Sequence, residues 1–281
     1  VYENDQPAET PDFLKWSENG PAEGELVFVA GNPGRTSRIF TTDALRYQRD
    51  HRMPFMLDFL RRREIMLQQF GLAGPEQARR AKDDLFGVQN SRKAYLGMLG
   101  GLQDPAVMAD KLSRENQLKA AIEKNPKLQP AMAAYSTIAE IQRQRTATLR
   151  TSISMNSQVF SLAHTIVQLV VEDQKPSGSR LPPYRDSGRA SLELGLYSDA
   201  PIYPDLEQAI LADLLGRLCE IRGGDDPLCQ EALNGLSPTE RAREVIAGTS
   251  LLDPQKRREL VAAGADAVRN SSDPLIQLAW V

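Results

Sequence analysis

Helical periodicity dominates the sequence from Thr41 onward. Apolar residues recur three or four positions apart, as with Met56 and Phe59 or Met66 and Phe70, and this spacing places them on one face of an α-helix. Five later segments pair a capping residue with Pro at the first helical position, a combination that starts helices. The pairs are Pro204 with Asp205, Asp226 with Pro227, Ser237 with Pro238, Asp253 with Pro254, and Asp273 with Pro274. We therefore expect a mainly all-α protein.

Glycine and proline divide the first half of this region into long helices. The expected boundaries, in order, are Gly71 to Pro75, then Gly97, Gly100 and Gly101, then Asp104 with Pro105, then Asn125 with Pro126, and a break near Ser152 to Asn156. The second helix is expected over residues 76–98, and a further helical stretch over residues 128–171. Helices of this length predict a multi-helix domain with long antiparallel helices.

The first 40 residues differ from the rest. Residues 25–30 form a short apolar run between Gly24 and the turn Gly31, Asn32, Pro33, Gly34, which is typical of a β-strand. A single strand leaves its backbone donors and acceptors without partners. We therefore expect its sheet either in missing sequence, which we favour, or in a second copy of the chain as a homodimer. The expected division is residues 1–40, a strand and linker, and residues 41–281, a helical domain.

Charge and hydropathy exclude several classes of partner. The 37 acidic and 34 basic residues give a net charge of -3, and this balance lacks the excess of basic residues that is typical of nucleic-acid binding. No run approaches the roughly 20 apolar residues that a membrane span needs. The N-terminus, Val1 to Asp5, has neither an initiator Met nor the features of a signal peptide, so we expect a fragment or a processed product.

The cysteine and histidine content predicts no metal and no cofactor. Cys219 and Cys229 lie ten positions apart, and we interpret them as two small buried hydrophobic residues, with a disulfide as the alternative. His51 and His164 are distant from each other and from the cysteines, so a zinc site is not expected. We expect His51 on the surface and His164 packed within an apolar helix.

No catalytic residue is expected within the chain. Neither a Gly-x-Ser-x-Gly elbow nor a Gly-Asn-Ser-Gly turn is present, and neither histidine lies in a catalytic context. Residues 31–36 link a strand to a helix like a phosphate loop, but the lysine of such loops is missing. Residues 83–94 are of more interest, because acids, an amide and bases surround Gly87 within an otherwise regular helix.

Three ordered landmarks resemble those of family 46 of the serine peptidases, which are bacterial dipeptidyl-peptidases. The landmarks are residues 25–36, residues 88–94 with Asn90, Ser91, Lys93 and Ala94, and residues 201–205. The resemblance implies a chymotrypsin-like double β-barrel with an inserted helical domain that covers the active-site cleft. It also implies that the His, Asp and Ser of the triad lie outside this chain, and that the protein is periplasmic or secreted.

The same resemblance assigns one site residue. It implies that Asn90 helps to hold the free α-amino group of a peptide substrate, with its partners in the missing catalytic barrel. The chain would then be a substrate-capping domain, inactive as an isolated polypeptide. The alternative is a self-contained helical module for protein interaction or peptide binding, in which Leu26, Phe28 and Val29 pack inside the chain or across a dimer and Asn90 faces no cleft.

Overall fold

The computed structural model describes residues 2–31, 37, 39–149, 155 and 157–281. The chain divides into two units, residues 1–39 and residues 40–281. In the first unit, β1 (Tyr2–Glu3) pairs antiparallel with β2 (Gln6–Pro7). Asn4 and Asp5 form the turn between them with φ of 52° and 60°, the left-handed backbone that a tight two-residue hairpin requires.

The strand expected over residues 25–30 is not formed. These residues have no regular secondary structure. Leu26, Phe28 and Val29 are 77%, 88% and 96% exposed, so they are not packed inside the chain. A strand is stabilised by the hydrogen bonds of a neighbouring strand, and within the described residues only β1 and β2 pair.

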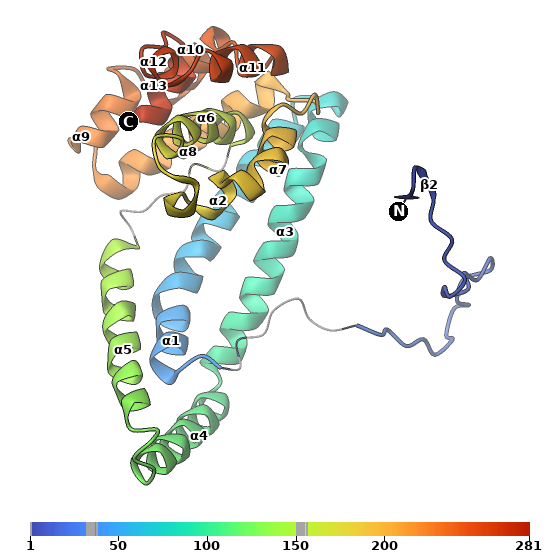
Figure 1. Ribbon diagram of the computed structural model, residues 1–281, viewed down its shortest axis with the longest axis vertical. Coiled ribbons are helices and arrows are strands. Elements are labelled where there is room, and N and C mark those ends of the chain that lie inside the picture. Colours follow the sequence, from blue (N-terminus) through green and yellow to red (C-terminus); the bar gives the residue numbers. More distant parts are fainter. Residues whose placement is uncertain (1, 32–36, 38, 150–154, 156) are drawn as a thin grey trace. The chain divides into compact units, whose positions relative to one another are not determined.

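A helical hairpin begins the second unit. It consists of α1 (Thr42–Tyr47), a π-helical segment (Gln48–Arg52), α2 (Met53–Gly71) and α3 (Pro75–Gln103). Figure 1 shows α2 lying along α3, which returns after a turn of three residues. Gly71 allows a close approach at this turn, because an added Cβ would lie 3.4 Å from the Cα of Ala78. The long antiparallel helices expected from the sequence are therefore present.

The expected end of the second helix at residue 98 is wrong. The helix α3 continues through Gly97, Gly100 and Gly101 to Gln103. Glycine lowers helix stability by about 1 kcal/mol but keeps the backbone N–H that the helix needs. Pro105 ends α3 instead, because Asp104 before it adopts the extended backbone that proline favours, with ψ of 117°.

The next two helices are α4 (Pro105–Glu123) and α5 (Pro130–Thr148). The carboxylate of Asp104 accepts a hydrogen bond from the backbone N–H of Ala106 at 2.8 Å and so caps α4, as expected. Glu115 of α4 accepts from the backbone N–H of Thr42 at 2.6 Å, which ties α4 to the start of α1. The break expected at residues 152–156 lies outside the described residues, apart from Met155.

Helices of varied length form the rest of the chain. They are α6 (Gln158–Glu172), the 3-10 turns Ser177–Ser179 and Pro182–Tyr184, α7 (Asp186–Leu196), α8 (Pro204–Arg222), α9 (Pro227–Leu233), α10 (Pro238–Gly248), α11 (Pro254–Ala262), α12 (Ala265–Arg269) and α13 (Pro274–Trp280). All five helix starts expected at a proline are confirmed. Asp226, Ser237, Asp253 and Asp273 cap their helices through the side chain, whereas α8 begins after Tyr203 without a side-chain cap.

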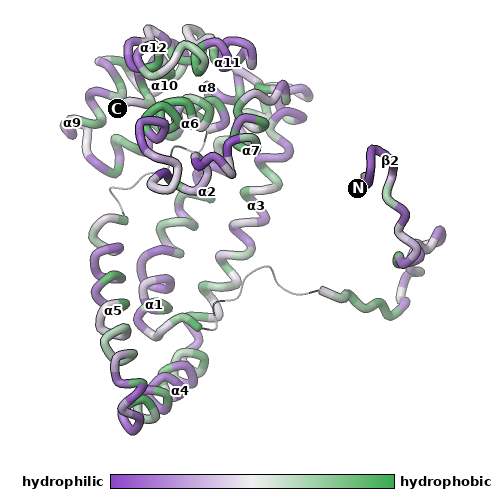
Figure 2. The backbone as a smooth tube through the Cα atoms, in the orientation of Figure 1, coloured by the Kyte–Doolittle hydropathy of each residue, from purple (hydrophilic) through white to green (hydrophobic). Residues whose placement is uncertain are grey.

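The main core surrounds α6, which Figure 2 shows as a predominantly hydrophobic helix. Val159, Ala163, Ile166 and Leu169 of α6 are fully buried against α8, α10 and α13. His164, expected to be packed, is exposed on this helix and stacks on Phe160 with ring centroids 6.5 Å apart. Ala163 and Ile166 lie on the buried face of α6, so position 164 between them faces solvent.

A second core joins the hairpin to α8. Its buried members are Leu67 of α2, Ala81 of α3, and Leu206, Ile210 and Leu214 of α8. The described residues thus form a mainly all-α protein, as the sequence predicts. No helix among them is both long enough and apolar enough to span a membrane.

The interpretation of the two cysteines as unbonded core residues is wrong. Cys219 near the end of α8 and Cys229 in α9 form a disulfide, with their Cα atoms 5.4 Å apart. Gly223, with φ of 95°, ends α8 and turns the chain back toward α9. This reversal brings the two thiols together, which the cysteine spacing alone did not decide.

Candidate functional site

Asn90 lies on the long helix α3, in its second half. Its side chain is exposed, and its amide makes no hydrogen bond with any other described residue. An amide presents one acceptor oxygen and two N–H donors. Asn90 is therefore free to bind an external polar group.

One carboxylate of α2 binds two residues of α3 close to Asn90. Glu64 of α2 is 9% exposed and accepts hydrogen bonds from Nε2 of Gln89 at 3.1 Å and from Nε of Arg92 at 2.6 Å. A third contact joins Nη2 of Arg92 to Glu64 at 3.4 Å. The charge-assisted bond from Arg92 is the main reason that the pKa of Glu64 lies below its ordinary value. Glu64 is thus ionised and bonded to Gln89 and Arg92, which lie one residue before Asn90 and two residues after it.

Another face of α3 borders a cavity of about 410 Å³ between α2, α3, α6 and α8. From α3 it is lined by Asp84, Gly87, Val88 and Ser91, whose spacing of three and four residues defines one helix face. Asn90 is not among the lining residues. The cavity and Asn90 therefore lie on different faces of α3. Gly87 has open space where a Cβ would stand, so close packing within the chain does not explain this glycine.

Two buried ionic groups, Arg63 and Glu207, line this cavity. Arg63 of α2 is 5% exposed, and its Nε lies 3.7 Å from a carboxylate oxygen of Asp213. Burial lowers the pKa of Arg63 and raises the pKa of Glu207, which is 4% exposed. Arg63 and Asp213 therefore join α2 to α8, while Glu207 bonds to the start of α6.

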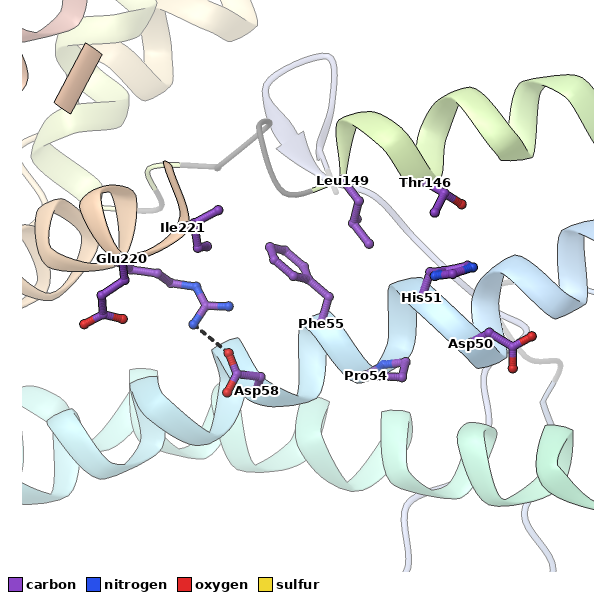
Figure 3. Close-up of a pocket in the computed structure, with 10 residues that line it drawn as sticks. Asp50, His51, Pro54, Phe55, Asp58, Thr146, Leu149, Glu220 and Ile221 are labelled. Carbon is purple, nitrogen blue, oxygen red and sulfur yellow. Dashed lines mark hydrogen bonds and ion pairs between the residues drawn. The ribbon is translucent and has the colours of Figure 1, made fainter. Parts of the chain in front are cut away.

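A larger cavity, of about 720 Å³, lies between the start of α2, the end of α5 and the end of α8 (Figure 3). His51, Asp50 and Asp58 line it, together with Phe55 and Arg217. Arg217 donates to Asp58 at 2.8 Å, the contact drawn as a dashed line in Figure 3. No serine is among the described residues that line this cavity. Its carboxylates are all paired, Asp58 with Arg217, Asp50 with Arg49 and Glu220 with Arg62.

The histidines do not form a catalytic arrangement with the rest of the described chain. His51 is exposed, as expected, and His164 is exposed on α6. Neither ring hydrogen-bonds to a hydroxyl or carboxylate among residues 2–31, 39–149 and 157–281. In this same part of the chain, no group of three or more His, Cys, Asp and Glu side chains is arranged to hold a metal ion.

The family described as Peptidase S46 matches residues 1–281, so the chain belongs to the Peptidase S46 family. The resemblance noted from the sequence is thereby confirmed.

One curated relative is the Asp/Glu-specific dipeptidyl-peptidase of Shewanella putrefaciens (strain CN-32 / ATCC BAA-453), which is 26% identical over 289 residues. The match covers 99% of this chain and 39% of the relative. The chain therefore spans about two fifths of the length of that relative.

The family resemblance singles out Asn90, but the sequence did not point to Glu64. The sequence does not show that Glu64 pairs with Gln89 and Arg92, because Glu64 lies 25 and 28 positions before them. Glu64 belongs to a run of charged residues in α2, and such a run is equally typical of a solvent-exposed helix face. Only the packing of α2 against α3 distinguishes Glu64 from its exposed neighbours.

Proposed function

We propose that this chain is the helical, substrate-capping part of a serine dipeptidyl-peptidase, which releases dipeptides from peptide N-termini. The observation that carries the proposal is the family match over residues 1–281 together with the exposed, unpaired amide of Asn90. The relative's name supports the same reaction class. The Ser nucleophile, His base and Asp would be supplied by a catalytic barrel outside this chain.

Asn90 would bind the free α-amino group of the substrate. Its amide oxygen accepts a hydrogen bond from an ammonium group without adding a charge of its own. Because the amine is two residues from the cleaved bond, an anchor at the amine sets the position of the cut. The exposure of Asn90 on the outer face of α3 leaves it accessible to such a ligand.

The test uses the complete peptidase and fluorogenic dipeptidyl substrates, either with a free amine or N-acetylated. We expect Asn90→Ala to lower kcat/KM for the free-amine substrate by about 10- to 100-fold, since hydrogen bonds to charged groups contribute about 1.5–3 kcal/mol. Residual cleavage of the N-acetylated substrate should not change. Unchanged kcat/KM for the free-amine substrate would remove the assignment.

A matched control is Asn116→Ala. Asn116 is also an exposed helical asparagine, but it lies on α4. This change should leave both substrates unaffected, which separates recognition of the amine from a general effect of removing a surface amide.

Two further parts of the proposal concern the chain by itself and its location. As an isolated polypeptide, residues 1–281 should not cleave the free-amine substrate, and turnover by this polypeptide would contradict the placement of the triad outside it. The family also favours a periplasmic or secreted protein. The disulfide between Cys219 and Cys229 supports that location, because disulfides persist in oxidising compartments.

A further inference from the structure

Glu64 is a buried carboxylate whose hydrogen-bond partners on α3 bracket Asn90. Gln89 precedes Asn90 by one residue, and Arg92 follows it by two. Both donate to Glu64, at 3.1 Å and 2.6 Å. Burying a carboxylate is costly unless hydrogen bonds replace its water, so this contact holds only when α3 presents both donors to α2.

The two donors define the rotation of α3 about its own axis. Successive residues of an α-helix are turned by about 100°, so Gln89 and Arg92 lie on one face and Asn90 is directed well away from it. If α3 rotated, both donors would leave Glu64 and Asn90 would turn with them. The bonds to Glu64 therefore set the direction in which Asn90 points.

Apolar packing of α3 is only partial at this level of the hairpin. The nearest fully buried residue of α3 is Ala81, in the core with Leu67. Ala81 is nine residues before Asn90, which corresponds to about 13 Å along the helix. Beyond Ala81, no residue of α3 is fully buried, and Val88, two residues before Asn90, is only partly buried against this core, so the bonds to Glu64 add to apolar packing in fixing the orientation near Asn90.

We propose that Glu64 is a positioning residue for substrate recognition, which orients Asn90 toward the α-amino group by holding Gln89 and Arg92. This inference rests on the proposed function of Asn90. Glu64 does not touch the substrate. It acts through the rotation of α3, and its effect should therefore appear in substrate binding and depend on the presence of Asn90.

The experiment is a double-mutant cycle in the complete peptidase with the free-amine substrate. We expect Glu64→Ala to raise KM, with little change in kcat, and to lower kcat/KM by about five- to twentyfold, because a small misplacement of a binding group weakens a well-oriented contact. In the Asn90→Ala background, Glu64→Ala should cause no further loss, since the group that it orients is gone. Glu64→Gln, which keeps an acceptor oxygen, should recover part of the loss.

Controls separate this role from folding. Glu76→Ala removes an exposed glutamate of α3 that also pairs with two arginines, Arg79 and Arg80, and it should leave kcat/KM unchanged. Thermal unfolding of each variant reports whether it is folded. If Glu64→Ala does not fold, Arg92→Met tests the same contact from its more exposed side.

The outcomes distinguish the two proposals. If Asn90→Ala impairs cleavage but Glu64→Ala does not, or if their losses simply add, the positioning role of Glu64 is wrong and the role of Asn90 stands. If Asn90→Ala has no effect, both proposals fall. A loss with Glu64→Ala that disappears in the Asn90→Ala background supports both.

Discussion

The carboxylate of Glu207 on α8 accepts a hydrogen bond of 2.5 Å from the hydroxyl of Ser157, the residue that caps the start of α6. The same oxygen accepts from the backbone N–H of Val159 at 3.0 Å. A negative group at a helix N-terminus is favourable, because the unpaired N–H groups there carry partial positive charge. Glu207 therefore joins the two helices that meet at the centre of the main core.

Burial of Glu207 predicts a specific pH dependence of stability. Burial raises the pKa of Glu207 in the folded protein above its ordinary value near 4.5. At a pH between the ordinary and the raised pKa, the folded state therefore binds more protons than the unfolded state. The contribution of Glu207 to the free energy of unfolding is fully present at a pH below its pKa in the unfolded chain. It is lost as the pH rises through its pKa in the folded protein. Glu207→Gln should therefore gain stability relative to the native chain as pH rises, measured by urea unfolding from pH 4 to 8.

Glu207→Ala is the matched comparison for this prediction. It removes the acceptor and leaves the Ser157 hydroxyl and the Val159 N–H unpaired, so we expect a loss of about 2–3 kcal/mol. If the native chain instead became more stable relative to Glu207→Gln as pH rises, the raised pKa of Glu207 would be contradicted.

The disulfide between Cys219 and Cys229 should contribute measurably to stability. It closes a loop of ten residues in the unfolded chain, which chain-entropy arguments value at about 2–3 kcal/mol. We expect the double change Cys219→Ala and Cys229→Ala to lower the free energy of unfolding by this amount. The midpoint in guanidinium should shift with reductant for the native chain but not for the double variant, and equal sensitivity of the two would count against the bond.

Arg217 should stabilise the fold more than its ion-pair partner does. Its guanidinium lies over the rings of Phe55 and Phe59, at 5.3 Å and 5.5 Å from their centroids, and its side chain is 6% exposed. Asp58, by contrast, is 72% exposed. We expect Arg217→Ala to cost about 1–3 kcal/mol through lost packing and cation–π contact. Asp58→Ala should cost less than about 1 kcal/mol, because exposed ion pairs contribute little.

Thermal unfolding of the two variants checks this order. An equal loss from Asp58→Ala would show that the ion pair, and not the aromatic contact, holds Arg217 in place.

Asp253 and Asp273 look equivalent in sequence, since each precedes a proline that starts a helix. Asp253 caps only α11, accepting from the N–H of Gln255 at 2.7 Å. Asp273 caps α13 and also accepts from the N–H of Ser250 at 2.8 Å and the hydroxyl of Thr249 at 3.1 Å. It therefore ties α13 to the end of α10 as well.

The Ala variants of these two caps should differ. Asp253→Ala should cost about 1 kcal/mol, the usual value of a helix cap. Asp273→Ala should cost about 2 kcal/mol or more, because the Ser250 N–H and Thr249 hydroxyl also lose their acceptor. Equal costs, measured by chemical unfolding, would mean that the contact to α10 adds no stability.

Local signals in the sequence determined where the helices begin and what class of fold they build. A capping side chain and a proline act within one helical turn, so Asp226, Ser237, Asp253 and Asp273 could be assigned without knowledge of any distant residue. The same holds for the start of α4 at Pro105, capped by Asp104. Glycines were a weaker local signal, because Gly97, Gly100 and Gly101 reduce helix stability without removing a backbone donor, and α3 continues through them.

Contacts between distant residues were decided only by the tertiary structure. The sequence pointed to Asn90, but its orientation depends on Glu64, which reaches Gln89 and Arg92 only because α2 packs along α3. The exposure of His164 and the pairing of Cys219 with Cys229 likewise depend on how helices turn and meet. The apolar run at residues 25–30 encodes a preference for a strand, but a strand forms only where a partner supplies hydrogen bonds. Local propensity is carried by neighbouring residues, whereas partners, burial and direction are set by packing between segments far apart in the chain.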